Sequence, residues 1–330
     1  MIFKGITLII LQVIRVVSFF LIFKLLFLIG DKSLVANFTI IESYVKIFAA
    51  ICSFGVFDNI IRLFQDYKGN LSLFLKNQFK IFLPLYFFCC LILFFTTSNI
   101  ENSSFIYQFI VLNLITDFFA GLFILLKKPI YSNLLHSAFA IFFLLCLFLL
   151  YQFSYNSNSI YFAWGLSKIF LIILSSIYFN RSLKSKFSSK KFFSNRVFLS
   201  AGSSFTLINL SNLLNANMAI IFVASFGSEI DIISLKLGQQ LTIFVPIITI
   251  AFSDQIKSKI SDSFSKNNFE DILEMFKKHR LYSSFTSILY LATIFIFLSL
   301  IVNFLSPNEN LNIDIIYLML IAPALQVLIG

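Results

Sequence analysis

Long apolar runs, broken by short polar clusters, follow one another along the 330-residue chain. A helix that crosses a membrane needs roughly 20 consecutive apolar residues, and most of these runs reach that length. The pattern predicts ten spans, at about residues 6–29, 35–58, 81–97, 104–126, 130–152, 159–179, 201–225, 232–252, 281–304 and 312–329. We therefore expect an all-α polytopic membrane protein.

The composition agrees with that expectation and excludes a soluble enzyme. Hydrophobic residues make up 59% of the chain and charged residues 12%, and the mean hydropathy is +0.92. Soluble domains are roughly 45–50% apolar and about a quarter charged. The four cysteines lie in apolar runs, only two histidines occur, and there is no Walker-type phosphate loop. We expect no metal, no cofactor, no catalytic residue and no enzymatic activity.

The basic residues predict the orientation of the chain. Lys and Arg gather in the loops after spans 2, 4, 6 and 8, which hold 18 of the 25 basic residues. The alternate loops at 98–103, 153–158, 226–231 and 305–311 hold none. Short cytoplasmic loops carry the excess of Lys and Arg, so both ends of the chain are expected in the cytoplasm. The net charge of +10 follows from this topology and does not require nucleic-acid binding.

The basic connection at 253–280 contains an amphipathic stretch. Asn268 is expected to cap a helix, and Glu274 and Lys278 are spaced to pair one turn apart. Its apolar face predicts a connector that lies flat at the inner interface.

A weak internal repeat predicts two bundles. A shift of 197 residues aligns Gly30 with Gly227, Arg62 with Lys259 and Lys80 with Lys277. These pairs give a six-helix period and a parallel repeat, as in several transporter folds. We expect an N-terminal bundle at 1–180, a basic cytoplasmic linker at 181–200 and helices 7–10 of a second bundle at 201–330. On this interpretation the chain is truncated at its C-terminus.

Polar residues inside the spans are the candidate functional residues, because ionisable groups at membrane depth usually face a bundle interior or a wet cavity. Spans 1, 2, 7 and 8 supply the candidate substrate cavity: Gln12, Arg15, Glu42, Lys46, Asn209, Asn212, Asn215, Lys236 and Gln240. Glu42 and Lys46 either neutralise each other or face the cavity. The three asparagines form either helix–helix hydrogen bonds or a hydrated wall.

The intramembrane charges predict an anionic substrate. Lys24 of span 1 is on another face than Arg15 and is expected to snorkel to the outer surface. Among the ions expected to be buried, the cations outnumber the carboxylates by +2; they are Arg15, Lys46, Lys168 and Lys236 against Glu42 and Asp117. A cavity with this bias attracts anions. Asp117 is the candidate coupling-ion or proton site.

Two segments carry a resemblance to a family. The stretch from Gly55 to Arg62, followed by Gln65 to Asn70, resembles the end of helix 2 in bacterial polysaccharide and O-antigen flippases. The block 209–226, Gly227, the next span and the basic loop to Arg280 follow the order of the family's second bundle. The chain is similar to Wzx-type translocases of the multidrug/oligosaccharidyl-lipid/polysaccharide exporter superfamily.

The resemblance implies two six-helix bundles around a cationic cavity in the bacterial inner membrane. It implies alternating access that moves an undecaprenyl-diphosphate-linked oligosaccharide to the periplasmic leaflet, with polysaccharide polymerase and chain-length proteins as candidate partners beside membrane lipids. Arg62 and Asp58 would then have a structural or gating role at the inner interface. Departures are the missing last two helices, the abundance of Phe and a Leu in place of a second Gly.

Three alternatives remain open. A cation-coupled multidrug exporter of the same superfamily would favour acidic cavity groups. A polysaccharide polymerase or ligase would need a large outside loop, which the sequence lacks. A membrane scaffold would give no reason for charges concentrated on four spans.

Overall fold

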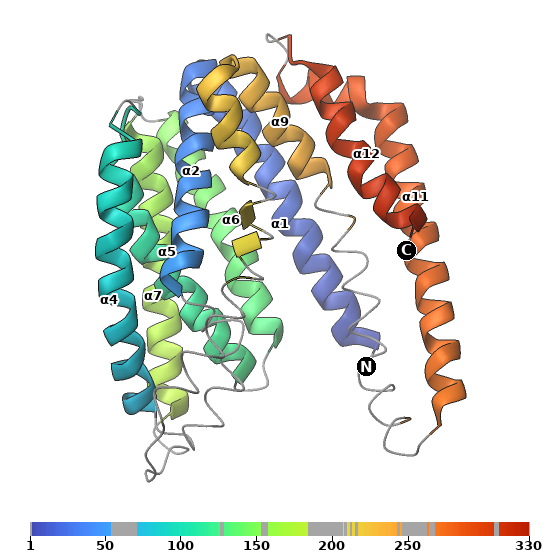
Figure 1. Cartoon of the computed structure of the whole chain (residues 1–330), viewed down its shortest axis with the longest axis horizontal. Coiled ribbons are helices and arrows are strands. Elements are labelled where there is room, and N and C mark those ends of the chain that lie inside the picture. Colours follow the sequence, from blue (N-terminus) through green and yellow to red (C-terminus); the bar gives the residue numbers. More distant parts are fainter. Residues whose placement is uncertain are drawn as a thin grey trace. The chain divides into compact units, whose positions relative to one another are not determined.

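A computed structural model describes residues 2–53, 71–98, 100–125, 129–152, 158–183, 207, 210–211, 213–214, 217–242, 245, 263, 268–306 and 310–329. Within these ranges every regular element is an α-helix (Figure 1). Six of the described helices are long and apolar enough to cross a membrane. The all-helical class is therefore confirmed, and the six apolar helices fit a polytopic membrane protein. The count of ten and the repeat stay predictions.

The helices lie where the apolar runs predict them. They are α1 (Ile2–Ile29), α2 (Lys32–Ser53), α4 (Leu71–Thr96), α5 (Ser104–Leu125), α6 (Pro129–Gln152), α7 (Asn158–Leu183), α9 (Glu229–Thr242), α11 (Phe269–Leu305) and α12 (Ile313–Ile329). A shorter apolar helix covers Asn217–Phe226. The chain forms two compact units, Ala36–Phe226 and the combination of Met1–Val35 with Gly227–Gly330.

Aromatic packing holds the unit Ala36–Phe226 together. Helices α5, α6 and α7 pack against one another. The rings of Phe109 and Trp164 lie 4.0 Å apart, and those of Phe105 and Tyr161 stack at 4.9 Å. Phe38 brings α2 into this core through Tyr161, which is almost completely buried. Aromatic pairs of this kind stabilise beyond the area that they bury, so part of the large Phe content serves packing.

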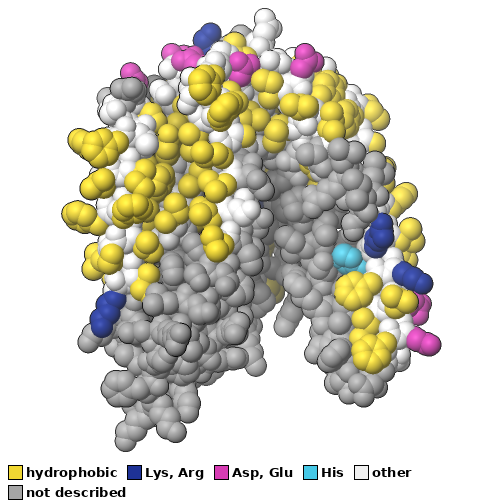
Figure 2. Space-filling model, in the orientation of Figure 1, with side chains coloured by type: hydrophobic (Ala, Val, Ile, Leu, Met, Phe, Trp, Pro, Cys, Tyr) yellow, Lys and Arg dark blue, Asp and Glu magenta, His cyan; other side chains and the backbone are white. Residues whose placement is uncertain are grey.

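Helix α4 presents an apolar surface outward. Only 11% of its window Phe79–Thr96 is buried, against 72% for α2. Large side chains such as Phe87 and Phe95 are exposed, and hydrophobic side chains cover α4 at the left edge of Figure 2. A patch of this size would aggregate in water, so lipid is its natural solvent.

In the unit that contains the C-terminal part of the chain, α9 and α12 make the closest approach. A Cβ atom at Gly238 would lie 2.8 Å from Cβ of Met319 and 3.4 Å from Cα of Ile316. Glycine at this position therefore lets the two backbones come together. In the same unit, α1 meets α11 where Nζ of Lys24 lies 3.4 Å from the ring centroid of Phe304.

A polar cluster ties the start of α9 to the segment before α12. The backbone N–H and the hydroxyl of Ser228 donate to Oδ2 of Asp231 at 3.0 and 2.8 Å. The side-chain amide of Asn312 donates to Oδ1 of Asp231 at 3.2 Å, and its backbone N–H donates to Ser234 at 2.8 Å. These donors, first among them the Ser228 N–H, lower the pKa of Asp231.

Helix α11 differs from the expected flat connector. The cap is confirmed, because the Asn268 side chain accepts from the Asp271 N–H, and Lys278 pairs with Glu274 at 2.6 Å. The helix then continues without a break for 37 residues, about 55 Å at 1.5 Å per residue. No Gly or Pro lies within it to end it, so the amphipathic stretch is the first part of a membrane-length helix.

We expect Gly238→Ala to lower the free energy of unfolding by about 1–3 kcal/mol, because the added methyl group meets the Met319 Cβ and the helices must move apart. Thermal unfolding in detergent micelles would measure this. Gly165→Ala is the matched control, because its Cβ would meet nothing nearer than Phe109 at 3.7 Å. Equal effects of the two substitutions would contradict the close approach.

We expect Asp231→Asn to destabilise the protein at neutral pH and to matter less in acid. Because the pKa of Asp231 is lowered by folding, its contribution is present above the unfolded pKa of about 4 and is lost as the pH falls through the folded value. Melting temperatures from pH about 3 to 8 would measure the difference from wild type, with the exposed Glu101→Gln as control. A difference that stays constant down to the lowest pH would contradict this role.

Candidate functional site

A charged pair lies in the middle of α2. Nζ of Lys46 is 2.7 Å from Oε1 of Glu42, one helical turn away. The Glu42 side chain is 12% exposed and that of Lys46 39% exposed. Glu42 is the eleventh residue of this 22-residue apolar helix, so the pair lies far from both helix ends. The structure therefore brings together these two predicted site residues, and in this state they neutralise each other.

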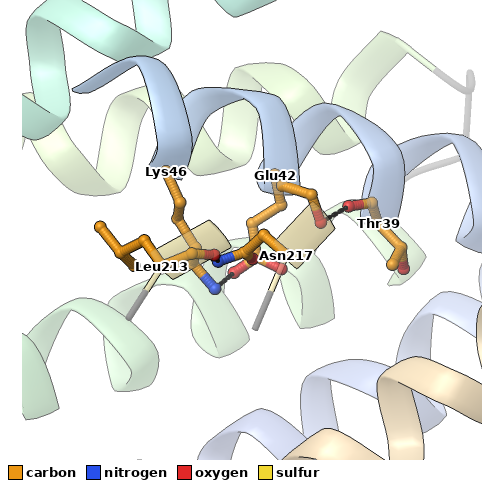
Figure 3. A network of polar contacts seen from close by, with 6 residues as sticks. Thr39, Glu42, Lys46, Leu213 and Asn217 are labelled. Atoms are coloured by element: carbon orange, nitrogen blue, oxygen red, sulfur yellow. Dashed lines mark hydrogen bonds and ion pairs between the residues drawn. The ribbon is translucent and has the colours of Figure 1, made fainter. Parts of the chain in front are cut away.

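Asn217 faces this pair from another helix. Figure 3 shows the side chains of Glu42 and Lys46 pointing toward the segment that carries Leu213 and Asn217. Asn217 is buried, at 4% exposure, and its amide donates to the backbone oxygen of Leu213 at 3.0 Å. Two helices thus contribute a carboxylate, an ammonium group and an amide to one polar site inside the unit Ala36–Phe226. We call Glu42, Lys46 and Asn217 the α2 polar site.

Sequence reasoning missed Asn217. The sequence prediction relied on three evenly spaced asparagines, Asn209, Asn212 and Asn215. These three residues lie outside the described part of the chain. Asn217 does not continue that spacing. The signal that could have found it is simpler: one amide side chain directly before the apolar run from Met218 to Ala224.

A second group of predicted residues lies on α1 and α9. Lys236 is buried, at 5% exposure, inside a stretch of α9 in which every residue from Ile232 to Gly238 is buried. Gln240, one turn further, is half-buried. Arg15 of α1 is also half-buried, and the placement of the Gln12 side chain is not described. The structure thus places a cation within the apolar part of this unit as well.

Lys168 has aromatic neighbours. Its Nζ lies 4.2 Å from the ring centroid of Phe139 on α6 and 5.3 Å from that of Trp164 on α7. Because the negative faces of aromatic rings attract cations, this contact stabilises a lysine that is 6% exposed. Lys168 is therefore integrated into the aromatic core. Asp117 of α5, the candidate coupling-ion site, is half-buried in the same unit.

The remaining candidates fall outside the described residues. Asp58 and Arg62, with the family-like segment around them, belong to this group. In the described part of the chain no cluster of three or more His, Cys, Asp or Glu could hold a metal ion. The chemistry that the described residues offer is ionic, namely the buried lysines Lys168 and Lys236 and the ion-paired Lys46, whose positive charges favour anions.

Comparisons with known proteins do not assign the chain to a family. No protein-family model matches the chain, and no curated protein matches it. The flippase resemblance therefore rests on the motif residues and their order.

We expect Lys46→Met alone to destabilise the protein by about 1–3 kcal/mol, because it leaves the Glu42 carboxylate without its ammonium partner. The double substitution Glu42→Gln with Lys46→Met should recover most of that loss, because both charges are then removed. Thermal unfolding of the four members of this cycle would measure the coupling.

The pair Glu274–Lys278 is the matched control, with the same spacing and a similar distance but side chains more than 60% exposed. Its cycle should show no measurable coupling, because exposed pairs are solvated and screened. Equal coupling at both pairs would mean that the position of Glu42 and Lys46 within α2 has no energetic consequence.

Proposed function

We propose that this protein is a membrane translocase for a lipid-linked oligosaccharide. It moves an undecaprenyl-diphosphate-linked oligosaccharide from the cytoplasmic to the periplasmic leaflet of a bacterial inner membrane, for surface polysaccharide synthesis. Transport proceeds by alternating access through a cationic central cavity. The observation that carries the proposal is the burial of lysine side chains among apolar residues, above all that of Lys236.

The physical argument for the proposal is the free-energy cost of placing a charged lysine among apolar side chains. A lysine at membrane depth costs several kcal/mol on most scales and is usually kept for substrate or ion pathways. Lys236 lies between the buried residues Leu235 and Leu237. Its aliphatic stem can pack there, and the ammonium group supplies the positive charge that a diphosphate needs.

The sign of the charges separates this function from its alternatives. Among the six candidate charges, Arg15, Lys46, Lys168 and Lys236 outnumber Glu42 and Asp117 by +2, which suits a diphosphate or acidic sugars. A cation-coupled multidrug exporter would favour an acidic excess. The Glu42 carboxylate, which could serve such an exporter, is already neutralised by Lys46.

The test is leaflet exchange in liposomes. The protein is reconstituted in liposomes with a fluorescent polyprenyl-diphosphate oligosaccharide. We expect wild type to exchange the lipid, and Arg15→Ala with Lys236→Ala to lose at least about tenfold in rate, because each removed charge contacts the diphosphate on its path. Quenching of the outer-leaflet fluorophore measures the rate.

Lys277→Ala is the matched control, since this exposed lysine of α11 lies outside the apolar part of the spans. It should leave exchange unchanged, and circular dichroism should show all variants folded. Exchange by the double variant at the wild-type rate would refute the cationic pathway. No exchange by wild type with several glycans would favour the exporter or scaffold.

A further inference from the structure

The charged residues of α11 end abruptly at Arg280. From Leu281 to Leu305 the helix contains no Asp, Glu, Lys, Arg or His, whereas Lys277, Lys278 and Arg280 follow one another directly before this apolar part, with one histidine among them. In Figure 2 the basic side chains of this stretch lie above its acidic ones, at the right edge of the view. We call Lys277, Lys278 and Arg280 the basic turn.

The length of the apolar part brings the basic turn to the depth of the lipid headgroups. From Leu281 to Phe304 the helix extends about 36 Å at 1.5 Å per residue. The hydrocarbon core of a bilayer is about 30 Å thick, and helices cross it with tilts of roughly 0–40°. A tilted α11 therefore crosses the hydrocarbon with its apolar part alone, and Arg280 lies at the level where the headgroups begin.

The side chains of the basic turn are accessible at that level. Lys277 and Arg280 are exposed, and the Lys278 side chain is 64% exposed and pairs with Glu274 at 2.6 Å. With this carboxylate counted, the three cations of the turn still give a positive surface. The remaining acidic residues, Glu270 and Asp271, lie in the first turn of the helix, where they complement the helix dipole. They are roughly 10 Å away along the helix axis, about one Debye length, so salt screens them from the basic turn.

Aromatic side chains lie on both sides of the basic turn. Phe276 is 52% exposed and Tyr282 is 57% exposed. Tyrosine is enriched at the boundary between membrane and water, because its ring is apolar and its hydroxyl is polar. Phe276 and Arg280 are four residues apart and share a face of the helix. The aliphatic part of Arg280 can therefore follow this apolar surface while its guanidinium group reaches the headgroups.

We propose that the basic turn binds the headgroup of an anionic phospholipid, with Arg280 and Lys277 in contact with its phosphate. Charge complementarity selects this occupant, because basic residues directly beside a membrane-spanning helix are attracted to anionic lipid. The guanidinium group of Arg280 can donate two parallel hydrogen bonds to phosphate oxygens, and Lys277 adds a second positive charge. The lipid holds α11 at a fixed depth in the bilayer. The inference does not depend on the proposed transport, because this lipid belongs to the bilayer and is not the substrate.

The experiment measures the preference for an anionic headgroup by native mass spectrometry. The chain in detergent micelles is incubated with equal amounts of dioleoylphosphatidylglycerol and dioleoylphosphatidylcholine, which carry the same acyl chains. We expect wild type to bind the anionic lipid at least about tenfold more than the zwitterionic one in dilute ammonium acetate, because each basic residue near an anionic group strengthens binding about fivefold. The preference should fall severalfold in concentrated ammonium acetate, because salt screens exposed charges.

Variants assign the preference to the basic turn. Lys277→Gln with Arg280→Gln should lower it about tenfold, and two substitutions are needed because a single one leaves two cations in place. The matched control, Lys32→Gln with Lys80→Gln, removes the same number of exposed charges from α2 and α4 and should keep the wild-type preference. Circular dichroism and binding of the zwitterionic lipid check that every variant is folded.

Three results would overturn the inference. They are a wild type that shows no preference, a Lys277→Gln with Arg280→Gln variant that keeps the preference, and a control variant that loses it equally. The last result would mean that the net charge of +10 attracts the lipid wherever the cations lie. Photo-crosslinking of wild type with a diazirine-labelled phosphatidylglycerol headgroup decides the location even if a variant does not fold. The label is expected in the peptide that contains the basic turn, and a label only elsewhere would contradict the site.

Discussion

The free energy of a charge in hydrocarbon is the constraint on which this protein depends. Lipid offers no hydrogen bonds, so backbone groups must pair within helices, and ionisable side chains persist only with partners, water or a role that requires them. The described residues meet these terms in three ways. Glu42 pairs with Lys46, Lys168 lies over the rings of Phe139 and Trp164, and Lys236 lies among buried residues of α9. In the first arrangement a cation neutralises a carboxylate, and in the second two aromatic rings stabilise a cation. These two arrangements are also the places where a ligand could compete.

The amino-acid sequence predicted the all-helical fold class and the approximate positions of the helices, because the length of an apolar run can be read directly along the chain. The described helices overlap the predicted spans, although α4 and α11 begin well before residues 81 and 281, where their spans were expected to start. The cap at Asn268 and the pair Glu274–Lys278 were both expected from local spacing. Local spacing also predicted Glu42 with Lys46, but it left open whether the two neutralise each other. The structure settles that they pair, with Glu42 largely buried.

What sequence could not supply depends on contacts between distant segments. Asn217 meets α2 across a helix–helix contact that no periodicity encodes. Gly238 is one of ten glycines, and only the backbone of α12 shows why this one must lack a side chain. The flat connector was wrong because amphipathicity signals an interface and does not signal where a helix ends; α11 continues because nothing from Phe269 to Leu305 stops it. The aromatic neighbours of Lys168 likewise required the fold.

The central claim is that the exposed part of the Lys46 side chain faces water and that the exposed aromatic residues of α4 face lipid. Accessibility of single cysteines to a charged methanethiosulfonate reagent tests it directly, in a chain whose four native cysteines are replaced by serine. Lys46→Cys should react much faster than Phe87→Cys, although the Lys46 side chain is 39% exposed and Phe87 is 76% exposed. Thiols react as thiolates, which form in water and not in hydrocarbon. Faster reaction at position 87 would contradict the account.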